Sequence, residues 1–593
     1  MSKPKLALIP SGYKSGKVYS ILPNDATGDF DFERQSIGTR VRKDGLIEEA
    51  KTVGSITNLQ IRSEEFNNSV WTKSNSTVTA DDILAPNGTN TADKLVENTA
   101  NAIHKVSSVI FSIPNNTYTF SVYAKKNGRS NFHLSLSDSA TGQANILVDL
   151  DNGTFTNGEK TTGSWTNVSG GIEELANGWY RVHVTGDKNS GTNVISDIEL
   201  YNSGRTYTGN GTSGIYIWGA MVSEGALSDY IKTEGTTETK RVETFTDVPR
   251  LDWLNSSCPS LLLEPQRSNI QLRSEEFDNA VWSKVNASIT ANQIVAPNGE
   301  YTADKLTATA SSLSTYVYEQ HSLSTSTDYS MSVFVKKGTS NLVRLDLEDF
   351  TSGTQGRMTF NLNTKEITQT VGTASYEDYG NGWYRLKVSF TTSATLGVHY
   401  LRIWDYETVN GAYFYLWGAQ MEQGSYPTSY IKTEASTVTR LKDECLNGGD
   451  SDLFDITEGT FFIDANNFGT PLNSYNMITL SDGGNNLIRF IYESSRIRTT
   501  VYNGATQQDY FITGTSDNQR NKVAITFKEN EFKTYFNGIL KDTDTSGVVP
   551  TNFNRLNFAG SSGTSRHFEG KVYDTRVYDR VLTEAEAIEL TTL

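Results

Sequence analysis

The chain has 593 residues, which is too long for one hydrophobic core and suggests three or four domains. Its net charge of −16 and its pI near 5.0 argue against nucleic acid and anionic membranes as partners, because neither attracts an acidic protein. No stretch approaches the roughly 18 apolar residues of a membrane span. Only 36% of the residues are hydrophobic, and 11% are aromatic. This composition is typical of strands joined by tight turns, so the expected fold class is all-β.

Residues 1–57 form the first segment. It begins with charged residues and lacks the apolar stretch of a secretory signal. Val18–Leu22 is a candidate strand, but the segment is too small to bury a core of its own. We interpret it as an attachment or oligomerisation segment. The alternative is an N-terminal extension that packs on the next domain.

The next part of the chain contains a duplication. Asn58–Leu95 and Asn269–Leu306 are identical at 24 of 38 positions without a gap, at an offset of 211 residues. Later motifs recur in the same order, as with WYRVHV at 179–184 and WYRLKV at 383–388. Alternating apolar residues and Asn-Gly turns predict strands and hairpins. We therefore expect two jelly-roll sandwiches of about eight strands each, module A at 58–235 and module B at 269–434.

Residues 236–268 lie between the modules. They contain Pro249, Pro259 and Pro265, which exclude a regular helix, and the apolar run Leu261–Leu263. We expect an ordered strap that packs against a neighbouring domain or subunit.

Residues 440–593 form a last domain, whose pattern of predicted strands differs from that of the two modules. Asn537-Gly538 predicts a two-residue hairpin turn. Thr583 and Glu586 have the spacing of a capping box, which predicts a short C-terminal helix.

Several of these stretches resemble a mosaic common in virion proteins of tailed phages. They are DFDFERQSIGTRVRKDGLIEE, the strap motif VPRLDW…CPSLLLEPQRSN, and the repeated RSEEF…W…APNG…TADKL. In that mosaic the repeated unit resembles a carbohydrate-binding-module jelly roll. The ending FEGKVYDTRVYDRVLTEAEAIEL is similar to that of concanavalin A-like, laminin-G-type lectin sandwiches.

The resemblance implies a virion protein that is assembled in the host cytoplasm, with tandem jelly rolls and a C-terminal lectin-like sandwich. Such a location fits a composition that looks extracellular in a chain without a secretory signal. The resemblance also implies that module A is inserted between two halves of one flanking unit. Residues 36–57 and 240–268 are therefore expected to touch in space.

The titratable residues show no catalytic or metal-binding pattern. Glu64-Glu65 and Glu275-Glu276 are adjacent, so on a strand they point to opposite faces, whereas glycosidase carboxylates face each other about 5–10 Å apart. The six histidines lack metal-ligand spacing, and Cys258 and Cys445 are interpreted as reduced structural thiols. We expect no enzyme activity, cofactor or metal, although a structural calcium ion is compatible with a jelly roll.

Aromatic residues can bind sugars through exposed ring faces. Three tryptophans recur at matching places in both modules, and we assign them to the cores: Trp71/Trp282, Trp179/Trp383 and Trp218/Trp417. The unmatched Trp165 and Trp404, together with Tyr406, are the candidates for carbohydrate contacts. The alternative is that they fill irregular cores or interfaces.

The leading hypothesis is a non-enzymatic head or tail fibre that displays glycan-binding modules. Repetition of weak sites can raise the effective affinity by roughly 10²–10⁴, which suits adhesion to a host or to environmental glycans. The expected partners are glycans, other virion proteins through the N-terminal segment, and copies of the chain itself, with a trimer assumed. The alternatives are an architectural capsid or tail decoration and a polysaccharide depolymerase.

Overall fold

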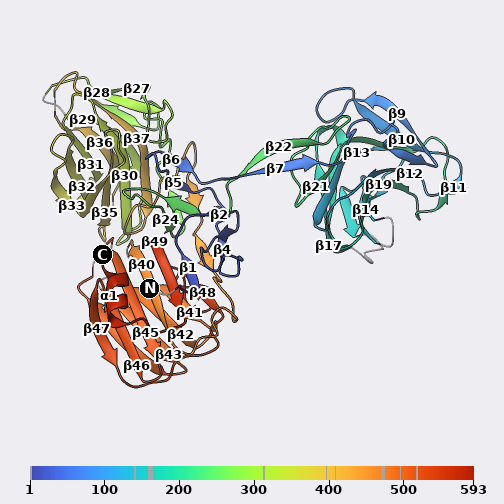
Figure 1. Ribbon diagram of the computed structural model, residues 1–593. Coiled ribbons are helices and arrows are strands. Elements are labelled where there is room, and N and C mark those ends of the chain that lie inside the picture. The colour runs from blue at the N-terminus through green and yellow to red at the C-terminus, as the bar shows by residue number, and fades with distance from the viewer. Residues whose placement is uncertain are drawn as a thin grey trace. The chain divides into compact units, whose positions relative to one another are not determined.

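Nearly every regular element of the chain is a strand, and the computed structural model divides them between two units (Figure 1). Unit 1 comprises residues 1–52 and 244–593, and unit 2 comprises residues 53–243. The structure describes residues 3–138, 142–157, 165–311, 314–395, 397–407, 409–468, 475–493, 496–515 and 518–593. Among these residues no helix has the length and apolar character needed to cross a membrane.

Unit 2 contains module A as two six-stranded antiparallel sheets. The sheet orders are β17-β18-β13-β21-β10-β9 and β16-β15-β14-β19-β12-β8. Apolar side chains from both sheets form one core, which includes Phe120, Val122 and Leu134. The strands are β7 (Thr52–Asn58), β8 (Thr72–Ser74), β9 (Ser76–Ile83), β10 (Ala92–Glu97), β11 (Asn101–Ala102), β12 (Lys105–Ile110), β13 (Thr117–Asn127), β14 (Asn131–Ser137), β15 (Gln143–Asp149), β16 (Thr154–Asn157), β17 (Trp165–Glu174), β18 (Tyr180–Lys188), β19 (Val194–Tyr201), β20 (Tyr207–Thr208), β21 (Gly214–Glu224) and β22 (Glu238–Thr244), with a 3-10 turn at Ala176–Gly178.

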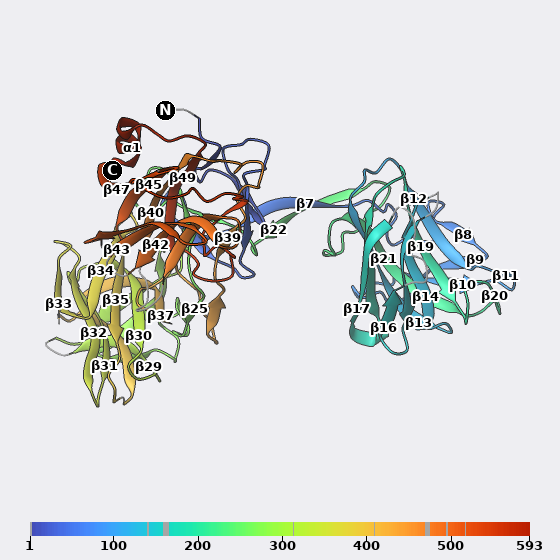
Figure 2. The same ribbon diagram turned by 90° about the horizontal axis from the view of Figure 1, so that it is seen from below.

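Module B repeats this topology strand for strand within unit 1. Its sheets run β27-β28-β37-β30-β35-β34 and β26-β29-β36-β31-β32-β33, and Figure 2 shows β35, β30 and β37 side by side. The two predicted sibling jelly rolls are therefore present. The strands are β26 (Ser283–Val285), β27 (Ala287–Ile294), β28 (Ala303–Ala308), β29 (Thr315–His321), β30 (Asp328–Lys337), β31 (Leu342–Asp349), β32 (Gly353–Asn361), β33 (Ile367–Val371), β34 (Thr373–Asp378), β35 (Trp383–Thr391), β36 (His399–Asp405) and β37 (Tyr413–Gln423).

Each jelly roll has more strands than the expected eight, because edge strands such as β9 and β27 carry few apolar residues and leave little pattern in the sequence. The paired tryptophans lie in the cores as predicted. All six are at most 4% exposed: Trp71, Trp179, Trp218, Trp282, Trp383 and Trp417.

The last domain is a sandwich of two further sheets, ordered β23-β24-β49-β40-β45-β46-β47, with β1 also on β49, and β44-β43-β42-β41-β48. Asn537 and Gly538 have φ of 45° and 79° and form the predicted two-residue turn between β46 and β47. The predicted helix is α1 (Glu584–Thr591), which begins with the Thr583–Glu586 capping box. The strands are β40 (Gly459–Asn467), β41 (Asn476–Ser481), β42 (Asn486–Glu493), β43 (Arg496–Asn503), β44 (Thr506–Thr513), β45 (Arg520–Lys528), β46 (Glu531–Phe536), β47 (Ile539–Asp544), β48 (Arg555–Asn557) and β49 (Gly570–Tyr578).

The N-terminal segment and the strap complete this last sandwich. Leu6 and Leu8 of β1 and Leu261 and Leu263 of β24 are buried in its core, and both strands pair with β49. The expected alternative of packing on the next domain is therefore corrected, because the segment packs on the last domain through β1 and on module B through Val41 and Ile47. The remaining strands are β1 (Leu6–Leu8), β2 (Tyr13–Lys14), β3 (Lys17–Val18), β4 (Phe30–Glu33), β5 (Thr39–Val41), β6 (Ile47–Glu49), β23 (Arg250–Asp252), β24 (Ser260–Leu263), β25 (Arg267–Asn269), β38 (Val438–Arg440) and β39 (Glu444–Leu446).

Module A is inserted into unit 1, as the resemblance implied. The chain enters and leaves unit 2 through β7 and β22, which pair with each other and are joined at Thr57 and Thr239 by a hydroxyl–hydroxyl bond of 2.8 Å. On the unit 1 side, the Val41 amide donates to Asp252 at 2.9 Å. The expected contact between the segments that flank module A is thus confirmed.

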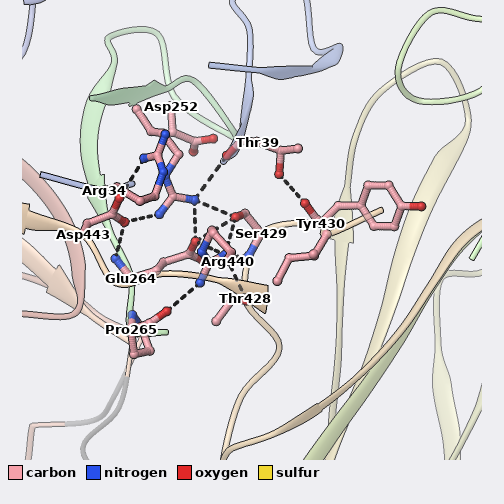
Figure 3. A network of polar contacts seen from close by, with 12 residues as sticks. Arg34, Thr39, Asp252, Glu264, Pro265, Thr428, Ser429, Tyr430, Arg440 and Asp443 are labelled. Atoms are coloured by element: carbon pink, nitrogen blue, oxygen red, sulfur yellow. Dashed lines mark hydrogen bonds and ion pairs between the residues drawn. The ribbon is translucent and has the colours of Figure 1, made fainter. Parts of the chain in front are cut away.

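Five buried charged side chains connect these distant segments of unit 1 (Figure 3). Asp443 accepts from Arg34 at 2.8 Å and also from Arg250. Glu264 accepts from Arg250 at 2.6 Å and from Arg440 at 2.9 Å. All five side chains are at most 3% exposed. We call this group the ion cluster.

Burial of the charged groups in the ion cluster costs free energy, and their pairing offsets this cost. Burial alone would raise the pKa of the Glu264 carboxyl, but Arg440 and Arg250 outweigh it and lower that pKa well below its ordinary value. A carboxyl whose pKa is lower in the folded state contributes stability above its unfolded pKa and loses it as the pH falls. Unit 1 is therefore expected to weaken in acid through this group.

We expect Asp443→Ala to destabilise unit 1 by roughly 3–5 kcal/mol, because it leaves the buried Arg34 guanidinium without a carboxylate and removes one of the two carboxylates that contact Arg250. Chemical denaturation followed by tryptophan fluorescence measures the loss. Asp579→Ala is the matched control. Asp579 pairs with Lys5 at an exposed site, where an ion pair contributes only about 0–1 kcal/mol. Equal effects of the two substitutions would contradict the proposed role of the ion cluster.

Candidate functional site

One sheet of module B has an outer surface rich in aromatic and charged side chains. Along β29 and β36 the residues alternate, so that Val317, Leu401 and Ile403 lie in the core and their neighbours point outward. The outward set on β29, β31 and β36 comprises Tyr316, Tyr318, Arg344, Asp346, Glu348, Tyr400, Arg402 and Trp404. We call these eight residues the aromatic face.

The rings of the aromatic face form a continuous row across two neighbouring strands. Tyr316 lies opposite Trp404 in the β29–β36 ladder, with ring centroids 4.1 Å apart. Tyr318 follows, 5.9 Å from Tyr316 and 5.2 Å from Tyr400. Phe350, which is 74% exposed, extends the row 5.0 Å beyond Tyr400. The row therefore offers ring surfaces at several adjacent positions.

Charged groups fix this row in place. Asp346 accepts from Trp404 Nε1 at 3.1 Å and from Arg402 Nε at 2.8 Å. Arg402 also donates to Glu348 at 2.8 Å, and its guanidinium lies 4.8 Å from the Trp404 ring centroid. A network of charge-assisted bonds restrains side-chain rotation, so the indole is held in one orientation before any ligand arrives.

Two of the three sequence-predicted ligand residues are in this region. Trp404 is on the aromatic face, and Tyr406 follows β36, with its ring stacked under Arg344 at 3.6 Å. Arg344 in turn lies opposite Trp404 in the β31–β36 ladder. Their role in binding carbohydrate stays a prediction.

Trp165, the third candidate, is in unit 2 and away from this group. It is 2% exposed and packs in the core of module A. Its placement matches the alternative of filling an irregular core, because a buried indole has no free ring face for a sugar.

Sequence reasoning missed most of the aromatic face, namely Tyr316, Tyr318, Tyr400 and Arg402. The available signal was the alternation of YVYE at 316–319 and HYLRIWD at 399–405, which places aromatic and charged residues on one side of two strands. The sequence alone does not reveal that these two strands, β29 and β36, are neighbours in the sheet.

Module A lacks this surface at the equivalent positions. The ladder β8–β12 has the register of β26–β29, so Lys105 occupies the place of Tyr316, at the same offset of 211. The β12–β19 ladder then places Glu199 at the position of Trp404. Glu199 is paired with Arg205 at 2.6 Å. The aromatic face is therefore a feature of module B alone.

The paired carboxylates are occupied by structural contacts. Glu64 and Glu65 lie in a turn rather than on a strand. Glu64 is buried and accepts from the Tyr230 hydroxyl at 3.1 Å, whereas Glu65 pairs with Arg62 at 2.9 Å. Module B repeats these contacts with Glu275, Tyr430, Glu276 and Arg273.

No metal site is evident among the described residues, where no three side chains of His, Cys, Asp or Glu gather to hold an ion. The structural calcium ion stays a prediction. Cys258 is exposed and Cys445 is buried, and both thiols are free.

Residues 464–587, within the last domain, match the model of the family described as the concanavalin A-like lectin/glucanases superfamily. Together with the strand topology, this defines the class of protein: an all-β chain of tandem jelly rolls followed by a concanavalin A-like sandwich. The family description includes both lectins and enzymes, so it does not by itself decide between them. A comparison of the sequence with curated proteins gives no match.

Among solved structures, the chain is similar to the CBM40 module of the Ruminococcus gnavus IT-sialidase bound to alpha2,3 sialyllactose, at 17% identity and a TM-score of 0.20, covering 23% of this chain and 83% of that one. The CBM22-1-CBM22-2 tandem of Paenibacillus barcinonensis Xyn10C gives 11% identity and a TM-score of 0.22, covering 62% and 98%. The LG1-3 region of the laminin alpha2 chain gives 10% identity and a TM-score of 0.16, covering 82% and 97%. Scores this low do not establish a shared fold.

Glu319 provides a test of the sheet that carries the aromatic face. It follows Tyr318 on β29 and points inward, where it is 6% exposed, and burial raises its pKa to about 8. Because the folded pKa is raised above the ordinary 4.5, the protonated carboxyl favours folding. That contribution is present below about pH 4.5 and is lost as the pH rises towards about 8.

We expect unit 1 to lose stability as the pH rises from about 4.5 to about 8, by an amount on the order of a few kcal/mol. Glu319→Gln should flatten this dependence, since an amide does not ionise. Denaturation at several pH values measures the slope. Glu300→Gln, at an exposed turn position of the same module, is the control and should leave the slope unchanged. A wild-type slope in Glu319→Gln would contradict the assignment.

Proposed function

We propose that the chain is an appendage protein of a tailed-phage virion that binds glycans through the aromatic face of module B. The observation that carries the proposal is the row of Tyr316, Tyr318, Tyr400 and Trp404 with charged groups beside it. Carbohydrate ligands use both kinds of group, because their C–H surfaces pack on aromatic rings and their hydroxyls bond to charged side chains.

The arrangement suits a binding site of modest affinity. Asp346 and Arg402 hold the indole of Trp404 in one orientation, which lowers the conformational entropy lost on binding. The face lies on the three neighbouring strands β29, β36 and β31 and presents its rings in a row, as a surface that contacts several residues of an extended chain would. Several copies of the chain in one virion would add their weak sites together.

The virion location rests on the sequence resemblance. Attachment to other virion proteins and assembly as a homo-oligomer belong to the same proposal. Because β1 is built into the last sandwich, attachment would use the outer surface of the N-terminal segment rather than its apolar residues. Labelling virions with an antibody against the chain tests the location and separates head from tail.

We further infer that the chain is not an enzyme. In both modules the adjacent glutamates are engaged by tyrosine and arginine partners, and in the ion cluster each carboxylate contacts two guanidinium groups. Such carboxylates are poor candidates for proton transfer to a sugar. Release of reducing ends from host polysaccharide by the purified chain would contradict this inference and would support a depolymerase.

We expect Trp404→Ala and Tyr318→Ala each to weaken glycan binding at least about tenfold, equivalent to about 1.4 kcal/mol, because each removes a ring face. Binding of the full chain to an array of host polysaccharides, followed by titration of the strongest ligand, measures the effect. Tyr301→Ala is the matched control, since Tyr301 is a 63% exposed tyrosine of module B in the loop between β27 and β28.

Equal binding by Trp404→Ala, Tyr318→Ala and the wild-type chain would contradict the proposed site. Absence of binding to every polysaccharide on the array would favour the architectural alternative, in which the chain decorates the capsid or tail without a ligand. Circular dichroism of each variant establishes that the loss reflects the site and not the fold.

A further inference from the structure

A cavity of about 660 Å³ lies inside unit 1, on the sheet of module B opposite to the aromatic face. One wall is the outer surface of the strands β34 and β35, with Ser375, Glu377, Arg385 and Lys387. The other walls come from the N-terminal segment, the strap, the loop at 425–430 and the edge of the last sandwich. Ligand pockets are typically about 300–1,000 Å³, so this volume suits a small molecule.

The walls of the cavity hold hydrogen-bonding groups of both kinds. Glu377 pairs with Lys387 at 2.6 Å, and Asp252 pairs with Lys571 at 2.7 Å. Amide, hydroxyl and aromatic residues also line the cavity, namely Asn255, Ser375, Phe468, Asn518 and Tyr573. The lining therefore contains acceptors, donors and ring surfaces, which is the combination that a molecule with many hydroxyls requires.

Two groups at the wall offer further polar interactions to a ligand. The Arg385 side chain is 2% exposed, and its Nε and Nη2 donate to the Ser332 hydroxyl at 3.2 and 2.9 Å. Arg385 lies opposite Glu377 in the β34–β35 ladder, but among the described residues no carboxylate is at ion-pair distance from it. The Asn466 Oδ1 atom is buried and has no hydrogen-bond partner there. Apart from Arg40 and Glu264, which pair with Glu48 and Arg250, the charged residues of the wall are three cations and two carboxylates. An anion in the cavity would balance this excess of positive charge.

We propose that this cavity binds a small acidic sugar, of mono- or disaccharide size, with its carboxylate towards Arg385 and its hydroxyls towards the Glu377–Lys387 and Asp252–Lys571 pairs. The two pairs are neutral overall, so Arg385 supplies the net positive charge of the wall. The site is separate from the aromatic face, because it uses β34 and β35 of one sheet whereas the aromatic face uses β29, β31 and β36 of the other. It does not depend on the proposed function.

The test is titration of the full chain with glucuronic and galacturonic acid, and with glucose and galactose as matched neutral sugars. We expect an acidic sugar to bind at least about tenfold more tightly than its neutral counterpart, since only the acidic sugar forms a charge-assisted bond with a buried guanidinium. Calorimetry measures the affinity. A rise in the unfolding midpoint of unit 1 with ligand concentration is the second readout.

Ser375→Trp is the blocking variant, because Ser375 is exposed on β34 and lines the cavity. We expect it to weaken binding of the acidic sugar at least about tenfold. Ser288→Trp is the matched control, since Ser288 is an exposed serine on β27, the other edge strand of the same sheet. If Ser375→Trp does not fold, Thr373→Phe at the next outward position of β34 replaces it.

Three results would overturn the proposal. They are the absence of binding by both acidic sugars, equal affinity for the acidic and neutral sugars, and unchanged affinity in the folded blocking variant. Trp404→Ala separates this site from the aromatic face. It should leave acidic-sugar binding unchanged, and a loss of that binding would assign it to the aromatic face instead.

Discussion

The ion cluster is the constraint on which the arrangement of unit 1 depends. Arg34 and Asp443 are 409 residues apart in the sequence, yet they form a buried ion pair. A buried charge that loses its partner has no water to replace it, so none of the segments that meet there can separate alone. The N-terminal segment, the strap and the linker before the last sandwich are thereby held together, and module B is positioned against them through Ser429, which donates to Glu264 at 2.7 Å.

The two jelly rolls show how a duplicated fold can keep its interior and change its surface. Trp71 and Trp282 both donate from Nε1 to a backbone carbonyl nine residues earlier, at 3.0 and 3.1 Å. On the outer surface the same strands carry Lys105 in one module and Tyr316 in the other. Folding depends on the buried contacts, whereas recognition depends on the side chains of the outer surface. Similarity of fold therefore says little about the ligand.

Most local patterns predicted the local structure, although the candidate strand Val18–Leu22 is not formed and β3 ends at Val18. The capping box at Thr583 and the apolar run Leu261–Leu263 act through neighbours in the sequence or through simple burial, and both lie as expected. The candidate site was predicted only in part. Trp165 was predicted wrongly, because an isolated tryptophan gives the same sequence signal whether it is buried or exposed. The partners of Trp404 on β29 were missed because they depend on strand pairing, which a single sequence does not reveal.

The insertion of module A has a consequence for how such a chain can change. The strands that lead into and out of unit 2, β7 and β22, are hydrogen-bonded neighbours. Unit 1 therefore accommodates an insertion of 191 residues at a place where a short hairpin loop would also connect the two strands. The entropy of closing a loop depends on the separation of its ends and only weakly on its length. Recombination can therefore exchange the whole cassette for another, altering what the molecule displays while its framework stays as it was.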